Sequence, residues 1–329
     1  MKRKLPTRMT PLVSIITINY NQLELTCQLL ESLRKVTYPA VEVIVVDNHS
    51  KEDPTSVITE RYPEVSLIVS KENLGFAGGN NLGIAASRGE YIFLLNNDTE
   101  VHPHALEPLV ELFQTHPEAG VASSMLLYFN SGETIQYAGS SRINPFTGRS
   151  KRIGYLEKDT GQYTEAQKTE LAHGAAMMVP RRIIDKVGLM PEFFFLYYEE
   201  VDWCESIKRA GHKIFFVPAS KVYHKESMSI GKGSTLKTYY MTRNRVLYMR
   251  RNTAGLTKIS WILFFLFFTL PKNAAMFFLR REGDHARAFW KGLLWNLTHT
   301  ENGERVKSFM STVKSSPEGG VREAAKANL

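Results

Sequence analysis

Short apolar runs alternate with amphipathic segments along the first hundred residues. The runs VSIITINY, VEVIVVDN, VSLIVSK and YIFLLNND predict strands, and the segment from Leu23 to Arg34 predicts a helix. The stretches 43–46 and 91–95 are apolar at every position, as is typical of strands that helices cover on both faces. The alternation therefore predicts an α/β fold with a mostly parallel central sheet flanked by helices.

The second half of the chain has a different pattern. Residues 129–170 are polar and rich in Gly, Ser and Thr, which predicts a surface excursion or lid. Beyond it, the pattern predicts a helix from Val201 to Arg209 and a strand from Lys213 to Val217. The small, polar residues 315–329 are expected to form a flexible tail.

Polar side chains close three of the predicted strands. They are Asn19, Asp47 with Asn48, and Asn96, Asn97 and Asp98. Ligands of open parallel sheets bind where the carboxyl ends of the strands meet the loops, so these residues are candidates for a common binding edge. Each of them alone is equally well explained as a turn residue or helix cap.

Amide and carboxylate oxygens suggest a metal site, and a cluster of carboxylates suggests a general base. Asp98 and Asn96 stand two residues apart on an extended backbone and suit a hard cation such as Mg²⁺ or Mn²⁺. The cluster Glu199, Glu200 and Asp202 follows the apolar FFFLYY. Crowding at the edge of a buried region would raise a carboxyl pKa towards the range of a general base, although acids at a helix start also suit the helix dipole. His224 is either a further ligand or a surface histidine.

The segment from Asn73 to Asn81 is a glycine-containing loop that runs into a helix. Its backbone can pass close to a ligand, and its first amides can face negative charge. No GxGxxG follows the first strand, because TINYNQ contains no glycine. A hydride-transfer enzyme with a dinucleotide fold is therefore disfavoured.

Charge and cysteine content narrow the class of protein. Only Cys27 and Cys204 occur, far apart, so neither a disulfide framework nor a cysteine metal site is expected. Residues 1–224 carry 23 Lys and Arg against 26 Asp and Glu, whereas residues 225–329 carry 18 against 7. A basic C-terminal part interrupted by apolar residues favours an anionic membrane surface over nucleic acid, for which no motif is present.

Eight segments occur in an order that is familiar. VSIITINYN, VIVVDNHS, NLGFAGGNN, YIFLLNNDT, HGAAMMVPR, FFFLYYEEVDWC, AGHKIFFVPASKVYH and TRNRVLYMRRN together resemble family 2 glycosyltransferases of the GT-A fold, specifically the rhamnosyltransferase-like enzymes of bacterial surface-polysaccharide synthesis. The resemblance covers about residues 11–255. It implies an inverting transfer from a nucleotide-diphospho-sugar, a dTDP- or UDP-sugar, with dTDP-rhamnose as the first donor to try.

The resemblance also implies roles for residues that match its motifs. Asn96 to Asp98 stands where the family has its DxD metal motif, and His224 matches the histidine that completes metal coordination. Glu200 is the expected catalytic base, with Glu199 and Asp202 as competitors, because this chain has Glu-Glu where the family often has Glu-Asp. The expected donor-binding residues are Thr17, Asn19, Asp47, Asn73, Asn80, Asn81, Asn96, Asn97, Asp98, Gly174, Ala175 and Arg243, the last of which could instead pack the domain.

The C-terminal part predicts membrane association. Residues 259–271, ISWILFFLFFTLP, are too few to span a bilayer alone, and joining them to NAAMFFL would bury Pro271 and Lys272 midway. Basic and Trp residues on both sides favour helices lying in the cytoplasmic leaflet of the cell membrane. A buried core or homodimer helix and a spanning helix are the alternatives.

Four regions and two functions follow from these patterns. The regions are a basic arm (1–10), a catalytic domain (11–255), a helical membrane-associating region (256–314) and the tail. The first function is sugar transfer to a glycan or polyprenyl-diphosphate-linked acceptor by a peripheral membrane enzyme. The second is an inactive nucleotide-binding or membrane-associated interaction protein with the same fold.

Overall fold

The computed structural model describes residues 10–225 and 234–304. The predicted tail, the last part of the predicted membrane-associating region and nearly all of the predicted basic arm lie outside these residues. The elements run in the order β1 (Val13–Asn19), α1 (Leu23–Leu33), β2 (Val41–Asp47), α2 (Thr55–Arg61), β3 (Val65–Val69), α3 (Gly75–Ala86), β4 (Tyr91–Leu95), β5 (Thr99–Val101), α4 (Glu107–Thr115), β6 (Ala119–Tyr128) and β7 (Ile135–Tyr137). The strands and the helix predicted in this half are confirmed.

The second half begins with β8 (Gln167–Thr169), β9 (Ala176–Pro180), α5 (Arg181–Val187), η1 (Glu192–Phe194), α6 (Glu199–Arg209) and β10 (Lys213–His224). The predicted helix at 201–209 and strand at 213–217 are confirmed, and β10 continues seven residues further, to His224. That extension carries the strand from the core to a cavity that His224 lines. The polar stretch 129–170 contributes only β7 and β8, which pair with β6 and β10.

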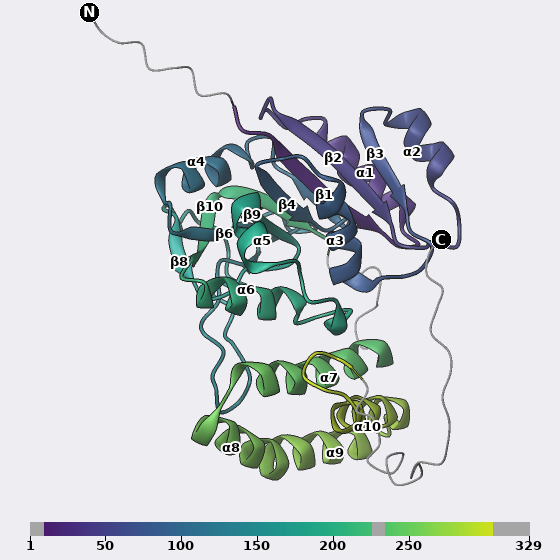
Figure 1. The fold of residues 1–329 in the computed structure, drawn as a ribbon, viewed down its shortest axis with the longest axis vertical. Helices are drawn as coiled ribbons and strands as arrows, with labels where there is room; N and C mark the ends of the chain where they lie inside the picture. The colour runs from purple at the N-terminus through teal and green to yellow at the C-terminus, as the bar shows by residue number, and fades with distance from the viewer. Residues whose placement is uncertain (1–9, 226–233, 305–329) are drawn as a thin grey trace, which may run out of the picture.

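One sheet forms the centre of the molecule, in the order β3-β2-β1-β4-β9-β6-β10-β5 (Figure 1). β3, β2, β1 and β4 are parallel, but β9 is antiparallel to both β4 and β6, and β5 is antiparallel to β10. The sheet is therefore mixed, which corrects the expectation of a mostly parallel one. The sequence could not reveal the direction of β9, because a short apolar run has the same composition in a parallel and in an antiparallel strand.

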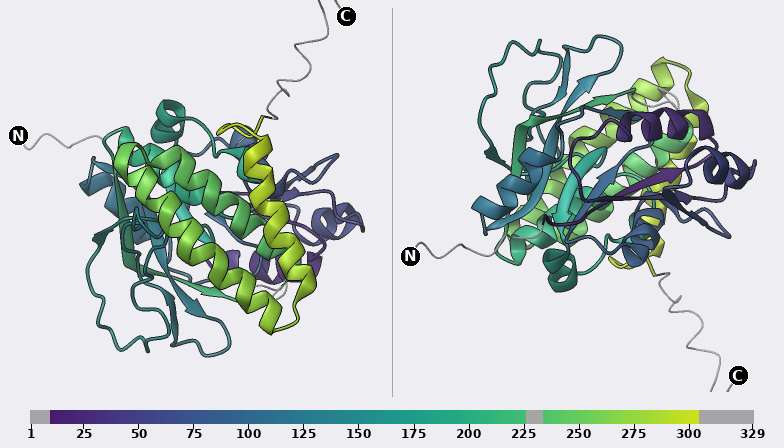
Figure 2. Two further views of the ribbon diagram at one scale, coloured as in Figure 1. Left: turned by 90° about the horizontal axis from the view of Figure 1, so that it is seen from below. Right: turned by 90° about the horizontal axis from the view of Figure 1, so that it is seen from above.

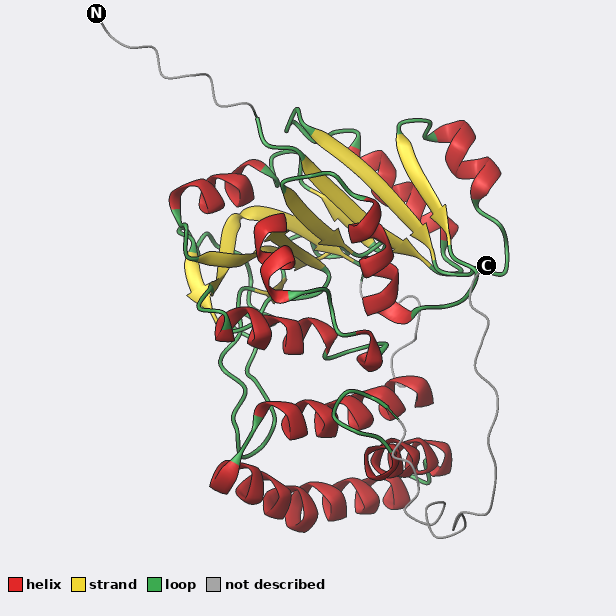
Figure 3. Cartoon of the chain, viewed as in Figure 1, coloured by secondary structure: helices red, strands yellow, loops and turns green. Residues whose placement is uncertain are grey.

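Alternate side chains of the strands pack into two apolar layers. Val13, Ile15 and Phe93 face a layer with α1, α2 and α4, whereas Ile16 and Ile92 face α3, α5 and α6. Figure 3 shows the sheet between helices on its two sides. This double cover explains why the central strands are apolar at every position.

Four C-terminal helices stack beyond α6, away from the sheet (Figure 1). They are α7 (Thr235–Asn252), α8 (Gly255–Phe264), α9 (Leu270–Leu279) and α10 (Gly283–Thr298), with a π-helical turn, η2 (Phe265–Thr269), joining α8 to α9. Trp261 and Phe265 turn inward and pack with the layer that also contains Leu247 of α7. The helices are thus packed onto the α6 side of the molecule.

α8, η2 and α9 form one continuous helix of 25 residues, Gly255–Leu279. It is long and apolar enough to cross a membrane, and only 17% of its most apolar stretch of 18 residues is buried inside the protein. Joining the two apolar runs places Pro271 and Lys272 inside this helix, as the sequence indicated. The wide η2 turn lies just ahead of Pro271 and takes up the irregularity that a residue without an N–H imposes on a helix. Seen from below, this helix and α10 cross one face of the molecule (Figure 2).

Candidate active site

A cavity of about 610 Å³ lies at the carboxyl ends of β1 and β4, between the sheet and the first turns of α3, α6 and α7. It is the kind of site expected where the parallel strands of an open sheet end. The cavity gathers ten of the residues predicted from the sequence: Asn73, Asn80, Asn96, Asn97, Asp98, Gly174, Ala175, Glu199, Glu200 and His224. Six predicted residues are not among its described lining: Thr17, Asn19, Asp47, Asn81, Asp202 and Arg243.

Asparagines shape the wall next to α3. Asn48 Nδ2 donates to Asn73 Oδ1 and to the Gly75 carbonyl, each at 3.0 Å, while Asn48 Oδ1 accepts from the Leu74 N–H at 2.9 Å. Gly75 has φ +70°, and a Cβ there would lie 2.3 Å from the Phe195 carbonyl oxygen. Only glycine therefore lets this loop approach the segment that precedes α6.

A polar network lies directly behind this wall. Asp47 accepts hydrogen bonds from Asn19 Nδ2 at 2.7 Å and from Ser50 Oγ at 2.6 Å, and Asn19 Oδ1 accepts from Thr26 Oγ1 at 2.9 Å. Asn97 Nδ2, which lines the cavity, donates to the same Thr26 hydroxyl at 3.1 Å. Asn19 and Asp47 thus fix the strand ends from within the protein. Thr17 is also buried, two residues before Asn19 on β1.

A carboxylate and an imidazole meet at the other end of the cavity. Asp98 Oδ1 and His224 Nε2 lie 3.2 Å apart, both side chains are buried, and neither atom has a hydrogen-bond partner among the described residues. β10 brings them together because His224 pairs with Thr99 in antiparallel register. Gln136 Oε1 lies 2.7 Å from His224 Nδ1. In the neutral tautomer that carries its proton on Nδ1, the imidazole donates to this oxygen and leaves Nε2 free to bind a metal ion.

This corner fits a divalent cation. Two buried side chains whose facing atoms have no hydrogen-bond partner in the described part of the chain are an arrangement that a metal ion can satisfy, and carboxylate and neutral imidazole are suitable ligands for Mn²⁺. Within residues 10–225 and 234–304 no group of three or more His, Cys, Asp or Glu residues could hold a metal. The remaining ligands would have to come from water, from the amide of Asn96 or from a bound phosphate.

The segment 173–175 joins this corner to the acids of α6. The Ala175 carbonyl accepts from the Asn96 N–H at 3.0 Å. A Cβ on Gly174 would lie 3.5 Å from Glu200 Cγ and from the ring of Phe76. The Glu200 side chain thus lies beside Gly174, close to the strand end that carries Asn96.

Glu199 and Glu200 open α6 inside the cavity. Burial raises the pKa of Glu199 well above that of an ordinary glutamate, and the neighbouring Glu200 charge raises it further. Burial also raises the pKa of Glu200, which is half-buried. Carboxyl groups with raised pKa values are suited to accept a proton near neutral pH. The helix dipole at this N-terminus favours the ionised form of one of them.

The backbone before these acids is strained. Phe195, Tyr197 and Tyr198 have φ values of +64°, +67° and +74°. None of them is glycine, and a residue in this region costs about 1–3 kcal/mol. Strained residues of this kind cluster at functional sites, and here they stand directly before the two acids of the cavity.

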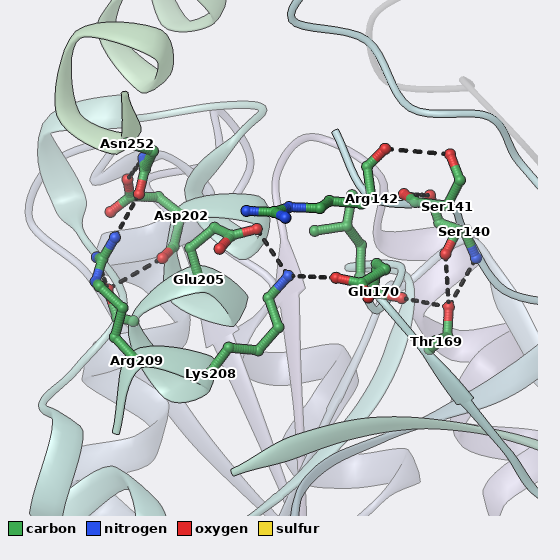
Figure 4. A network of polar contacts seen from close by, with 12 residues as sticks. Ser140, Ser141, Arg142, Thr169, Glu170, Asp202, Glu205, Lys208, Arg209 and Asn252 are labelled. Atoms are coloured by element: carbon green, nitrogen blue, oxygen red, sulfur yellow. Dashed lines mark hydrogen bonds and ion pairs between the residues drawn. The ribbon is translucent and has the colours of Figure 1, made fainter. Parts of the chain in front are cut away.

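Asp202 lies one turn further along α6 and is not among the described lining of the cavity. Its carboxylate accepts from Arg251 Nε and Nη2, each at 3.2 Å, and from Asn252 Nδ2 at 2.7 Å. Figure 4 shows Asp202 and Asn252 in this network beside Glu205, Lys208 and Glu170. Asp202 therefore fastens α6 to α7, and the structure separates it from the two acids with which it was grouped.

Two more predicted residues make contacts within the protein. Asn81 Nδ2 donates to the Met190 carbonyl at 2.9 Å and to Glu192 Oε1 at 2.8 Å. Arg243 is buried, with its guanidinium carbon 4.4 Å from the centre of the Trp295 ring. Both side chains hold the segment before α6 rather than reaching into the cavity.

The cavity also contains residues that sequence reasoning missed, among them Tyr20, Gln22, Phe76, Gln136, Arg152, His173, Tyr197 and Lys237. His173 precedes Gly174 in the segment HGAAMMVPR and could have been found there. Burial, together with the neighbouring His224, lowers its pKa to about 3. Gln136 and Arg152 come from the stretch read as a surface excursion, in which no pattern marked them.

Comparison with known proteins is consistent with this geometry. The family profile "Glycosyl transferase family 2" matches residues 14–188. The chain is 27% identical over 240 residues to the low-salt glycan biosynthesis hexosyltransferase of Haloferax volcanii, covering 71% of this chain and 74% of that one. It is 24% identical over 244 residues to the N-acetylglucosaminyl-diphospho-decaprenol L-rhamnosyltransferase of Mycobacterium tuberculosis, covering 68% and 79%. The chain is also 30% identical over 257 residues to an uncharacterized protein of Sinorhizobium fredii. That match covers 75% of this chain and only 28% of the relative's length.

Two solved structures share the fold. A mannosyltransferase of Pyrobaculum calidifontis in complex with GDP-Man and Mn²⁺ superposes with a TM-score of 0.53 at 16% identity, covering 89% of this chain and 88% of that one. GalNAc-T7 with UDP, GalNAc and Mn²⁺ gives a TM-score of 0.58 at 17% identity, covering 74% and 48%. The GT-A fold expected from the sequence is thereby confirmed.

Proposed function

Because the chain belongs to glycosyl transferase family 2 and is a glycosyltransferase, we propose that it moves a sugar from a nucleotide-diphospho-sugar to a hydroxyl group with inversion at the anomeric carbon. One observation carries this proposal. A single cavity contains both the buried Asp98–His224 corner and the Glu199–Glu200 pair with raised pKa values. A diphosphate leaving group and an attacking hydroxyl need these two kinds of group at once.

Glu200 is the proposed base. Its carboxylate would take the proton from the acceptor hydroxyl while that oxygen attacks the anomeric carbon from the side opposite the leaving nucleoside diphosphate. Its position against Gly174, beside the strand end that carries Asn96, supports the role. Glu199 is more deeply buried, and in our proposal it keeps the local charge low by holding its proton.

Asp98 and His224 are the proposed protein ligands of Mn²⁺ or Mg²⁺, with Asn96 beside them. Bound there, the ion would supply positive charge to the diphosphate of the donor. Asn73, Asn80 and Asn97 line the same cavity and offer hydrogen bonds to the nucleotide or sugar. Mn²⁺ in both solved structures named above supports a metal-dependent reaction.

The donor we propose first is dTDP-rhamnose. The Mycobacterium tuberculosis relative is named as an N-acetylglucosaminyl-diphospho-decaprenol L-rhamnosyltransferase, which supports both this sugar and a polyprenyl-diphosphate-linked acceptor. Lys237 and Arg152 line the cavity, and neither forms an ion pair among the described residues. They are suited to the second diphosphate that such an acceptor carries.

We also propose that the enzyme works on the cytoplasmic face of the cell membrane. The outer stripe of the helix Gly255–Leu279 exposes Leu256, Ile259, Leu263, Phe267 and Phe278 at helical spacing. The exposed basic residues Lys272 within the helix and Arg280, Arg281 and Lys291 beyond it suit anionic headgroups.

A helix lying in the membrane plane agrees better with its contacts than a spanning helix. Its inward residues Trp261, Phe265 and Phe277 are buried, and α10 packs alongside. A spanning helix would have to leave these contacts or draw them into the lipid. A second copy of the chain on the same face is the competing proposal, and it predicts a dimer in solution.

The decisive experiment for the activity is a panel of sugar nucleotides incubated with the protein, with and without chelator. Release of nucleoside diphosphate and shifts in the melting temperature are both measured. We expect one sugar nucleotide to be turned over in a metal-dependent manner. A protein that bound a nucleotide with no turnover of any sugar would instead support the inactive interaction protein.

A further inference from the structure

The segment that leads into α6 has a backbone held almost entirely from outside itself. Residues 193–198 contain the three left-handed residues Phe195, Tyr197 and Tyr198, and the acids Glu199 and Glu200 follow at once. A strained backbone persists only where its surroundings hold it. The contacts that do so therefore decide where the two carboxylates lie.

Two neighbouring residues of α7 provide most of these contacts. Asn244 Nδ2 lies within hydrogen-bond distance of three carbonyl oxygens, those of Phe194 (2.9 Å), Leu196 (2.7 Å) and Tyr197 (2.8 Å). Arg243 Nη2 donates to the carbonyls of Phe193 and, at 2.8 Å, Phe194. Arg243 Nε donates to Asn244 Oδ1 at 2.7 Å, so the two side chains support one another.

The remaining carbonyl of this run, that of Phe195, is held by α3. The Phe195 carbonyl accepts from the N–H of Phe76, at the first turn of α3, at 2.7 Å. Every carbonyl from Phe193 to Tyr197 thus has a donor from another element. Asn244 is fully buried and Arg243 nearly so, which protects these hydrogen bonds from competing water.

α10 in turn holds Arg243. Asn296 Nδ2 donates to the Arg243 carbonyl at 2.9 Å, and the guanidinium lies over the rings of Trp295 and Tyr240. α7 and α10 pack along one another. A continuous set of contacts therefore runs from the helices of the proposed membrane face to the backbone that carries the acids.

We propose that Asn244, supported by Arg243, is a positioning residue for the catalytic carboxylates, and that the C-terminal helices are part of the active site's framework as well as a docking surface. The proposal rests on the proposed function in one respect, that Glu200 is the base. It gives the segment TRNRVLYMRRN a role different from ligand binding. Neither side chain touches the cavity, and each acts through the backbone of residues 193–197.

The test compares Asn244→Ala and Asn244→Asp with a matched control, Asn252→Ala. Asn252 lies on the same helix and also donates two hydrogen bonds, to Asp202 and to the Tyr248 carbonyl, but away from residues 193–197. Asp has the shape of Asn without its donors, which separates lost hydrogen bonds from lost volume. Amide hydrogen exchange of a peptide covering residues 193–200 is measured, together with kcat and KM for the sugar nucleotide selected by the panel.

We expect faster exchange of residues 193–200 in both Asn244 variants and in neither the wild type nor Asn252→Ala. We expect kcat to fall roughly 100-fold with little change in the donor's KM, as a carboxylate displaced by about 1 Å would cause. Wild-type exchange and wild-type kcat in a folded Asn244→Asp protein would overturn the proposal. If the wild type turned over no sugar nucleotide, the proposed function would fail, and the exchange comparison alone would decide whether Asn244 holds this backbone.

Discussion

The apolar stripe of the helix Gly255–Leu279 gives the prediction with the clearest magnitude. Phe267 is 69% exposed and Phe278 83% exposed, and we expect both to enter the lipid interface. Burying a whole side chain of this kind is worth about 1.5–3 kcal/mol, so burying these fractions of both is worth about 3 kcal/mol. Replacing both with Ser should therefore weaken membrane partitioning roughly 100-fold. Neither residue is buried in the protein, so the fold should remain intact.

Vesicle flotation measures this change directly. The double variant is compared with the wild type on phosphatidylcholine vesicles with and without phosphatidylglycerol. The double substitution of Val69 and Leu189 with Ser is the control, because these residues are about half exposed and lie on β3 and after α5. Wild-type flotation of the Phe variant would refute the membrane assignment. A wild type that is dimeric in solution and becomes monomeric in the variant would assign the stripe to a second copy of the chain.

Three further outcomes follow from the site. In Glu199→Gln, the free energy of unfolding in urea should exceed that of the wild type by an amount that grows with pH above 4.5, by about 1.4 kcal/mol per pH unit up to the raised pKa. In that range the folded wild type holds the Glu199 proton and the unfolded chain does not, so the wild type loses stability as the pH rises. A difference independent of pH would contradict the raised pKa of Glu199. Arg251→Met should cost about 3 kcal/mol by leaving buried Asp202 uncompensated, while binding of UDP with Mn²⁺ stays unchanged; weaker nucleotide binding would return Asp202 to the site. Gln136→Leu should weaken Mn²⁺ binding in the presence of UDP about 10- to 100-fold by calorimetry, because His224 loses the partner that orients it; an unchanged affinity would remove that role.

Local patterns predicted the first half of the fold well. The apolar runs that became β1, β2 and β4 are short, continuous and buried on both faces, so their composition leaves little choice of structure. The direction of β9 and the length of β10 depend on long-range pairing, which no local pattern encodes. No local pattern predicted that the π turn η2 would join the two apolar runs into one helix.

The site was predictable where chemistry and position coincide. Asp98 follows a strand directly, and Glu199 and Glu200 open a helix after an apolar run, so each carried a local signal. Side chains that support others were harder to assign. Asn19, Asp47 and Arg243 have the polarity of ligand-binding residues, but their donors and acceptors are used within the protein. Only the folded chain distinguishes a polar group that faces the cavity from one that holds its wall.

Glu200→Gln tests whether Glu200 takes the proton from the acceptor hydroxyl. The variant keeps the size of the side chain and removes its ability to take a proton, so turnover of the selected sugar nucleotide should fall about 100- to 10,000-fold. Calorimetric binding of the nucleoside diphosphate with Mn²⁺ should stay at the wild-type level, because Asp98 and His224 are untouched. Lost turnover with retained nucleotide binding is expected if Glu200 is the base. Turnover at the wild-type rate would contradict that role.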